Sequence, residues 1–411
     1  MIEKKCCDKI IIKKNIDSKE ASKNKDTKEN NQNLNYLDLN KNQQDKKQVE
    51  NPINSSNTKN SLSNDFNDII FMKGFLHEYC KDFDEKFELL EQLKSGSAGS
   101  VYRGQLRNKP NSKPIAFKFL YDNNKTITIS DNKNEQKKKN KNDSIKHLEI
   151  SIHGLLKHKN IPEIYGYYKI QNSSCIVMDF NKYGDIENFK KKVIKRSSLS
   201  ESIVLYIAGG VLQALYYIHT KYKIIHMDIK QQNVLIDDFL NIKLTDYSVS
   251  INYRNSKDYI ELPLVGTCYY MSPEVLHRKK ILVKEASKID IYSLGVLLYL
   301  LAFYDYPYKL NDVNSKDYSQ IAKNINQNDL EFPKDTGHSK VFINFLKNCL
   351  NKDIKKRYDI YHAVKDPWFE GYQIILDEKE QLYNAGKFVI DLMVDNIISF
   401  NEYIKSQEKK L

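Results

Sequence analysis

The stretch IHMDIKQQNVLI, residues 225–236 of 411, is the most informative part of the sequence. Two short apolar runs, each suited to a β-strand, enclose a polar loop. The loop carries Asp228, Lys230 two residues later and Asn233 five residues after the Asp. A role as simple turn formers would explain each of these polar residues singly, but it explains the whole set poorly.

A second apolar run ends in another carboxylate, at Asp246 in LTDYS, residues 244–248. Phosphoryl transfer needs hard oxygen ligands for Mg²⁺ and a carboxylate near the attacking hydroxyl. Asn233 and Asp246 suit the first task, and Asp228 suits the second. The two loops together therefore predict a site for phosphoryl transfer.

Two further motifs precede this pair of loops. Gly96 and Gly99 stand three apart in LKSGSAGSVY, residues 93–102, which suits a tight strand–turn–strand whose backbone N–H groups approach phosphate oxygens. This signal is weak by itself. Behind it lies the strand IAFK, from which Lys118 projects to the opposite side from its apolar neighbours. A helical stretch then opens near Glu149, which can form an ion pair with Lys118.

In this order the motifs resemble the signature set of the eukaryotic protein kinase family, of the Ser/Thr type, over about 280 residues. Further matches are GTCYYMSPE at 266–274, DIYSLG at 290–295, and Arg357, which would pair with Glu274. The resemblance implies an α+β, bilobal protein kinase fold. A β-rich N-lobe is expected at residues 87–180 and a mainly helical C-lobe at residues 181–370, with ATP in the cleft between them.

The resemblance also implies roles for individual residues. Asp228 would align the substrate hydroxyl and accept its proton, while Lys230 offsets charge on the transferred phosphoryl group. Lys118, fixed by Glu149, would orient the phosphates. The metal ligands for Mg²⁺ would be Asn233 and Asp246, and the substrate platform would include Thr267 and Glu274. The ATP-binding residues would be Gly96, Gly99, Val101, Ala116, Lys118, Met178, Asp179, Asn181, Asp185 and Leu235.

Five positions depart from the family's pattern, and one of them is Tyr247, which stands where the family has Phe but keeps a ring there. Lys94 replaces the first glycine of the loop, and Ala98 replaces an aromatic residue at its tip. Met227 stands where most kinases have an Arg that reaches a phosphate on the activation loop, so we expect activity without such a phosphate. Ser248 replaces a glycine, which restricts the backbone and adds a hydroxyl.

The predicted function is that of an ATP-dependent protein kinase acting on Ser and Thr hydroxyls of protein substrates, because Lys230 and Thr267 resemble the Ser/Thr arrangement. Gln232 and Leu300 stand where carboxylates often select Arg, so no strong preference for Arg before the target is expected. One alternative is a pseudokinase or ATP-binding scaffold, motivated by Ser248 and Lys94. Another is a kinase-fold enzyme for a small molecule or lipid, which the substrate platform argues against.

Composition divides the rest of the chain. Residues 1–65 are rich in Asn and Lys and too poor in apolar residues to repay the entropy of ordering, so a disordered tail is expected. Residues 66–86 would form a linker or leading helix, and residues 122–144 a polar insert within the kinase domain at 87–370. Residues 371–411 have helical apolar spacing, which suits packing onto the domain or binding to a partner.

Cysteine content, net charge and the N-terminal sequence indicate the expected cellular compartment and partners. The six cysteines show no CxxC spacing and no secretory signal opens the chain, which predicts reduced thiols in the cytoplasm. The nucleus is the alternative, because KKKNK at 137–141 is a candidate localisation signal, and Cys6-Cys7 is a candidate palmitoylation site. The net charge of +12 is interleaved with Asn and Asp, so direct nucleic-acid binding is not expected. No membrane segment is expected, and the oligomeric state is left open.

Overall fold

The computed structural model describes residues 76–77, 82–96, 99–121, 149–170, 173–194, 198–308, 317–334, 337–384 and 398–410. All of them belong to one compact unit, Met72–Leu411. The predicted tail (1–65), the polar insert (122–144), Ala98 and most of the linker (66–86) lie outside the described residues.

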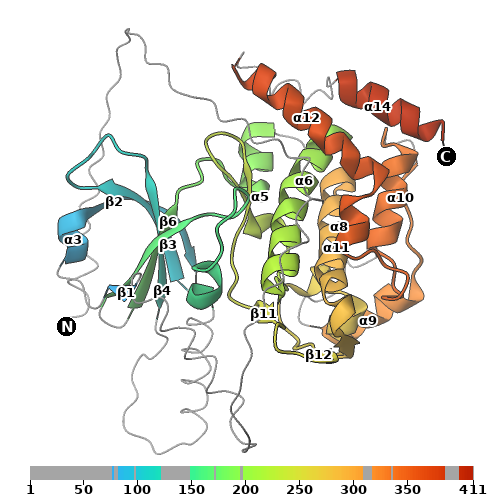
Figure 1. The fold of residues 1–411 in the computed structure, drawn as a ribbon, viewed down its shortest axis with the longest axis horizontal. Coiled ribbons are helices and arrows are strands. Elements are labelled where there is room, and N and C mark those ends of the chain that lie inside the picture. Colours follow the sequence, from blue (N-terminus) through green and yellow to red (C-terminus); the bar gives the residue numbers. More distant parts are fainter. Residues whose placement is uncertain are drawn as a thin grey trace, which may run out of the picture. The chain divides into compact units, whose positions relative to one another are not determined.

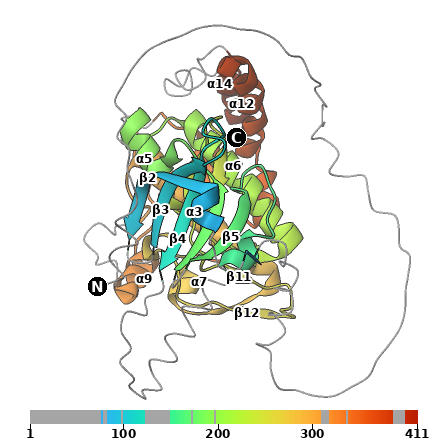
Figure 2. The same cartoon turned by 90° about the vertical axis from the view of Figure 1, so that its left-hand side faces the viewer.

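A six-stranded sheet forms the N-terminal part of the unit (Figure 1), in the order β1-β5-β6-β4-β3-β2. Its strands are β1 (Leu76–His77), β2 (Phe87–Gly96), β3 (Gly99–Leu106), β4 (Ile115–Tyr121), β5 (Ile164–Ile170) and β6 (Ser173–Asp179). β1 pairs in parallel with β5, and the other neighbours are antiparallel. Figure 2 shows this sheet from the side of the short helix α3 (Asp82–Lys86).

Strand β4 shows how the sequence positions the site. Side chains alternate between the two faces of a strand. Phe117 packs with Phe83 and Phe87 on one face, while Ala116 and Leu120 pack with a different buried cluster on the other. Lys118 shares the face of Ala116, so the alternation directs its ammonium group away from the aromatic cluster.

Helices make up most of the C-terminal part (Figure 1), and the predicted β-rich N-lobe and mainly helical C-lobe are confirmed. They are α5 (Ile186–Phe189), α6 (Glu201–Tyr217), α7 (Pro273–Leu276), α8 (Ser287–Phe303), α9 (Tyr318–Gln327), α10 (Lys340–Cys349), α11 (Ile360–Val364), α12 (Pro367–Asn384) and α14 (Ile398–Glu408).

Two helical stretches, Glu201–Tyr222 and Val283–Phe303, are long and apolar enough to cross a membrane by length and composition. Most of each stretch is buried inside the unit, 78% and 89% of the most apolar window. A helix that is apolar all round suits the middle of a large core equally well. The burial of α6 and α8 accounts for their composition.

Helices α12 and α14 pack on the C-lobe. The Tyr372 ring of α12 lies against Gly209 of α6, where a Cβ atom would come within 2.2 Å of the ring. On α14, Ile404 is buried, and the Tyr403 hydroxyl donates to the carbonyl of Pro367. Since α12 begins at Pro367, the predicted boundary at residue 370 falls inside a continuous helix.

Three small ribbons position the polar loops of the C-lobe. β9 (Val234–Ile236) lies between β7 (Gly184–Asp185) and β10 (Ile242–Leu244), β8 (Ile224–Ile225) pairs with β11 (Ile251–Asn252), and β12 (Tyr259–Glu261) pairs with β13 (Lys280–Leu282). The loop 226–233 connects β8 to β9, and Asp246 follows β10. Pairing of these strands therefore brings the two carboxylate-bearing loops together.

Candidate active site

Asp290, a fully buried residue of α8, holds the loop 226–233 in place. Its carboxylate accepts hydrogen bonds from the backbone N–H of His226 at 2.7 Å and of Met227 at 3.0 Å. It also lies 2.7 Å from Nε2 of His219. Met227 has a φ of 71°, in the left-handed region that non-glycine residues seldom occupy. The two hydrogen bonds to Asp290 stabilise this conformation and fix the direction of the next residue, Asp228.

Asp228, Lys230, Asn233 and Thr267 form one hydrogen-bonded group, which we call the base network. Lys230 Nζ lies 2.6 Å from Asp228 Oδ2 and 2.9 Å from Thr267 Oγ1. The Thr267 hydroxyl donates to Asp228 Oδ1 at 2.7 Å. Asn233 Nδ2 donates to Oδ2 and to the backbone carbonyl of Asp228, at 2.9 and 2.8 Å. Because Oδ1 accepts a single hydrogen bond from the residues that the structure describes, it keeps a lone pair for another donor.

Gly266 allows Thr267 to approach the loop. Its φ of 102° lies in a region that favours glycine, and an added Cβ atom would lie 2.4 Å from the carbonyl oxygen of Met227. A larger residue would force the two backbones apart. The glycine therefore decides whether Thr267 can reach Asp228.

Lys118, Glu149 and Asp246 form a second group, the lysine cluster. Lys118 Nζ lies 2.5 Å from Glu149 Oε1 and 3.4 Å from Asp246 Oδ1. Burial would lower the pKa of Lys118, but the negative charges of Glu149 and Asp246 outweigh burial and raise it. The cluster therefore joins three parts of the chain around the Lys118 cation. These are β4, the helical residues 149–153, and Asp246, which lies two residues after β10.

Asp246 is held as a carboxylate. Burial would raise its pKa, but the charge of Lys118 and a hydrogen bond from the Ser248 side chain hold the pKa well below its usual value. Ser248 is the residue that replaces glycine in the family's pattern. Its added hydroxyl thus contacts the carboxylate that the sequence assigns to a metal ion.

Tyr247 lies between two histidines. Its ring is fully buried, 5.0 Å from the ring of His153 and 4.9 Å from that of His226, and its hydroxyl donates to the carbonyl of Leu244 at 3.3 Å. Burial lowers the pKa of His153 to about 4. The Tyr ring therefore packs against a neutral His153 and against His226, and its extra hydroxyl has an acceptor.

The glycine-rich turn joins β2 to β3, where Gly96 pairs with Gly99. A Cβ atom at Gly99 would lie 2.0 Å from the carbonyl oxygen of Phe119 on β4. Only glycine fits this close approach, which places Gly99 beside the strand that carries Lys118.

The predicted adenine-binding residues come from both lobes. Ala116 pairs with Met178 across β4 and β6, and Leu235 lies on β9. Val101 on β3 pairs with Lys118. All four side chains are buried or half-buried, which suits apolar walls around a ring.

Asp179 and Asn181 lie where β6 ends. The Asn181 side chain donates to the carbonyl of Asp179 at 3.2 Å, and the Asn181 carbonyl accepts from Gly184. The backbone N–H of Asn181 has no hydrogen-bond partner within the described ranges. This N–H is therefore a donor left for the edge of a bound base.

Asp185, predicted to bind ribose, has a local partner. Its two carboxylate oxygens accept from the backbone N–H and the side-chain amide of Asn188, at 2.8 and 3.0 Å. Asp185 thus forms the N-cap of α5. Each oxygen keeps a further lone pair, so capping and binding of a hydroxyl are compatible.

Glu274 is paired with Arg357 in a bidentate geometry, at 3.0 and 3.1 Å. Arg357 also lies over the ring of Tyr292, 4.9 Å from its centroid. Both ends of the ion pair are buried. The pair joins α7 to the segment after α10, and it supports the platform that begins at Thr267.

The set of oxygen donors fits Mg²⁺ bound together with phosphates. Within the described residues, the Asn233 side chain uses Nδ2 for both of its hydrogen bonds, which leaves its side-chain oxygen for a cation, and Asp246 is an anionic oxygen ligand. In the part of the chain that the structure describes, no group of three or more His, Cys, Asp or Glu could hold a metal ion. A divalent cation here would need oxygen atoms from a bound nucleotide.

The sequence prediction did not assign a role in the site to Asp290, although it noted the motif. A single carboxylate in a helix as apolar as α8 must have buried partners, because an unpaired buried charge is very unfavourable. That signal was present, but the identity of the partners, the N–H groups of His226 and Met227, depends on the tertiary fold.

A bilobal unit with a carboxylate, a paired lysine and a glycine-rich turn at one site defines the class of phosphoryl-transfer proteins. The family model for the protein kinase domain matches residues 87–369. The chain belongs to the protein kinase family.

Several curated relatives match over about the same region. The serine/threonine-protein kinase dst2 of Dictyostelium discoideum is 30% identical over 287 residues, which are 69% of this chain and 23% of that protein. The dual specificity mitogen-activated protein kinase kinase jkk-1 of Caenorhabditis elegans is 28% identical, over 70% of this chain and 62% of its own length. The serine/threonine-protein kinase Aurora-2 of Arabidopsis thaliana is 26% identical, over 69% and 89%. The match thus spans less than two thirds of dst2 and jkk-1.

Proposed function

We propose that the chain is an active protein kinase that transfers the γ-phosphate of ATP to Ser and Thr hydroxyls of protein substrates. The observation that carries the proposal is the free lone pair on Asp228 Oδ1, next to Lys230 and Thr267. A carboxylate in this state can accept the proton of a substrate hydroxyl.

Each residue of the candidate active site has a distinct proposed role. Asp228 aligns the substrate hydroxyl and accepts its proton, while Lys230 offsets negative charge on the transferred group. Lys118, fixed by Glu149, holds the phosphates of ATP. Asn233 and Asp246 would hold Mg²⁺, which neutralises phosphate charge when it is bound.

Support for Ser/Thr preference comes from the link between Lys230 and Thr267 at 2.9 Å and from the names of two relatives. The name of jkk-1 includes dual specificity, so tyrosine is the competing acceptor. Phosphoamino-acid analysis of the labelled product separates the two. Ser and Thr should carry nearly all of the label.

The test is transfer from γ-labelled ATP with Mg²⁺ to a mixed protein substrate, with the wild type beside Asp228→Asn. We expect the variant to lose about 10³-fold in kcat, because Asn cannot accept the proton. The matched control is Asp329→Asn, an exposed carboxylate, which should keep full activity. If folded wild type gives no more label than Asp228→Asn, the protein is a pseudokinase, and the contact of Ser248 with Asp246 becomes the first cause to examine.

We also propose a cytoplasmic location, with the nucleus as the alternative. In support, Cys268 and Cys349 are buried thiols that form no disulfide among the described residues, as expected in a reducing compartment. Microscopy of the tagged full chain tests the proposal, and secretion of the tagged protein would contradict it.

A further inference from the structure

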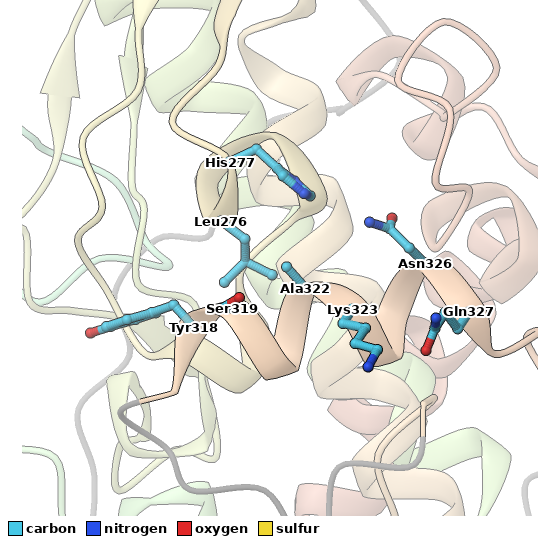
Figure 3. A pocket seen from close by; sticks show the side chains of 8 residues that line it. All are labelled: Leu276, His277, Tyr318, Ser319, Ala322, Lys323, Asn326 and Gln327. Carbon is cyan, nitrogen blue, oxygen red and sulfur yellow. The ribbon is translucent and has the colours of Figure 1, made fainter.

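A groove lies on the C-lobe between α7 and α9, apart from the residues of the candidate active site. Its volume is about 530 Å³. Leu276 of α7 faces Ala322 of α9 across it, and His277 and Asn326 lie along one side (Figure 3). Leu276 and Ala322 are buried and aliphatic, so the floor of the groove suits an apolar side chain.

The rim of the groove is positively charged. Among the lining residues that the structure describes none is acidic, and Lys323 lies on α9. Arg278 and Lys279 continue the chain beyond His277, and all three cationic side chains are exposed. None of the three forms an ion pair with an acidic residue in the described stretches of the unit. These charges are therefore available to a partner.

Two acidic residues described near the groove oppose this charge in part. The Asp317 carboxylate accepts from the backbone N–H of Gln320, as the N-cap of α9. Asp329 lies beyond the end of α9. At that same end, Lys352 Nζ donates to the carbonyls of Asn326 and Asn328 and adds another positive charge. Lys323, Arg278, Lys279 and Lys352 therefore outnumber the two carboxylates described near the groove.

The groove is connected to the substrate platform. The short 3₁₀ helix η5 (Cys268–Tyr270) follows Thr267 directly, and α7 begins three residues after it ends. Helix α9 contacts both η5 and α7. A protein bound in the groove would therefore be held next to the segment whose Thr267 hydroxyl contacts Asp228.

We propose that this groove docks an acidic segment of the substrate protein that carries one apolar side chain, and that docking raises kcat/KM for that substrate. The inference rests on the proposed kinase function. Electrostatic complementarity selects the acidic partner, and the aliphatic floor receives the apolar side chain. A nucleic-acid backbone would satisfy the cations but offers nothing to Leu276 and Ala322, so a peptide is the better fit.

The experiment compares two peptide substrates on the full chain. The first is a short phosphoacceptor peptide, and the second is the same peptide joined by a flexible Gly/Ser linker to a segment of one Leu among several Glu. With wild type we expect kcat/KM about tenfold higher for the second peptide, mainly through KM, because the docked segment raises the effective concentration.

Two kinds of variant distinguish docking in the groove from nonspecific electrostatic attraction between the acidic peptide and the protein surface. Lys323→Glu with Arg278→Glu should abolish the gain and leave kcat/KM for the short peptide unchanged. Asn326→Trp fills the groove without changing charge at an exposed position, and it should also abolish the gain. The matched control is Lys405→Glu, an exposed lysine of α14, which should keep the gain.

The outcomes separate this inference from the proposed function. If the short peptide is phosphorylated and the acidic segment gives no gain, or the gain survives in both groove variants, the docking proposal is wrong and the kinase function stands. If neither peptide is phosphorylated, anisotropy of the fluorescein-labelled acidic segment decides. Binding that Lys323→Glu removes supports docking, whereas no binding, or binding of single-stranded DNA in preference to the peptide, overturns it.

Discussion

The base network and the lysine cluster sit in one active site but are assembled in different ways. The base network comes from the C-lobe alone, between residues 228 and 267, and is anchored by the buried Asp290. The lysine cluster joins residues 31 and 128 positions apart, from the N-lobe sheet, a helix and the C-lobe. The first group is therefore formed as soon as one lobe folds, whereas the second depends on how the two lobes meet.

The largest effect should come from breaking the lysine cluster with Lys118→Met. We expect kcat to fall about 10³-fold, because the cation that we propose holds the phosphates of ATP is lost. The variant also leaves Glu149, which is 3% exposed, as a buried carboxylate without its partner. Radiolabel transfer measures kcat, and urea unfolding measures the free energy of unfolding.

The double variant Lys118→Met with Glu149→Leu sharpens this result. Replacing a buried ion pair by apolar residues is often neutral for stability, whereas removing one partner is destabilising. The double variant should therefore recover stability over the single one while staying inactive. If the double variant regained activity, the lysine cluster would have no role in transfer.

Breaking the anchor of the base network should cost stability as well as rate. Asp290→Asn places an amide donor against backbone N–H groups, and we expect a loss of about 3 kcal/mol in the free energy of unfolding. The exposed control Asp329→Asn should stay within about 0.5 kcal/mol of wild type. An unchanged urea midpoint for Asp290→Asn would show that the loop 226–233 is held by other contacts.

The sequence predicted features that form within one segment of the chain better than features that depend on contacts between segments. The alternation in β4 fixed the side on which Lys118 projects, and the loop between β8 and β9 was evident from its two apolar flanks. By contrast, neither the φ of 69° at Asp246 nor the hydrogen bond from Ser248 to Asp246 is demanded by the residue types at these positions. The capping of α5 by Asp185 has a local signal, since Asn188 lies three residues on.

Other parts had no local signal at all. The groove requires that α9 lies against α7, although 41 positions separate Leu276 at the end of α7 from Asp317, the N-cap of α9. Contacts between elements so far apart depend on packing of the whole C-lobe. Periodicity within one helix cannot reveal them.

A smaller effect should appear in the pH dependence of stability, through His153 beside Tyr247. Its folded-state pKa of about 4 lies below the ordinary value of 6.5, so the unfolded chain binds the proton first as the pH falls. This contribution to stability is complete above pH 6.5 and is lost toward pH 4, with a loss of about 2 kcal/mol between pH 6.5 and 5.

His153→Phe keeps a ring next to Tyr247 but cannot titrate. The free energy of unfolding of this variant should therefore fall less between pH 7 and 5 than that of wild type. His158, whose pKa burial also lowers to about 4, contributes equally in both proteins. Equal slopes in urea titrations of the two proteins would contradict a buried neutral His153.

The smallest effect concerns the segment from Asp246 of the lysine cluster to Thr267 of the base network, which we call the activation segment. It is held by backbone pairing at both ends, β11 with β8 and β12 with β13, and by the bond from the Ser250 hydroxyl to the carbonyl of His226. Met227 is buried and has no charge to offer a phosphate. We therefore expect phosphatase treatment, and the variants Ser256→Ala and Tyr259→Phe, to leave kcat within about twofold.

This expectation follows from the interactions that hold the activation segment in place. A loop phosphate activates by supplying charge-assisted bonds that the unmodified loop lacks. Here the strands already supply backbone bonds on both sides of the exposed Tyr259, and the residue that would receive the phosphate is apolar. If phosphatase abolished turnover and autophosphorylation restored it, the two ribbons would not suffice to hold the platform, and another cation would have to replace the missing Arg.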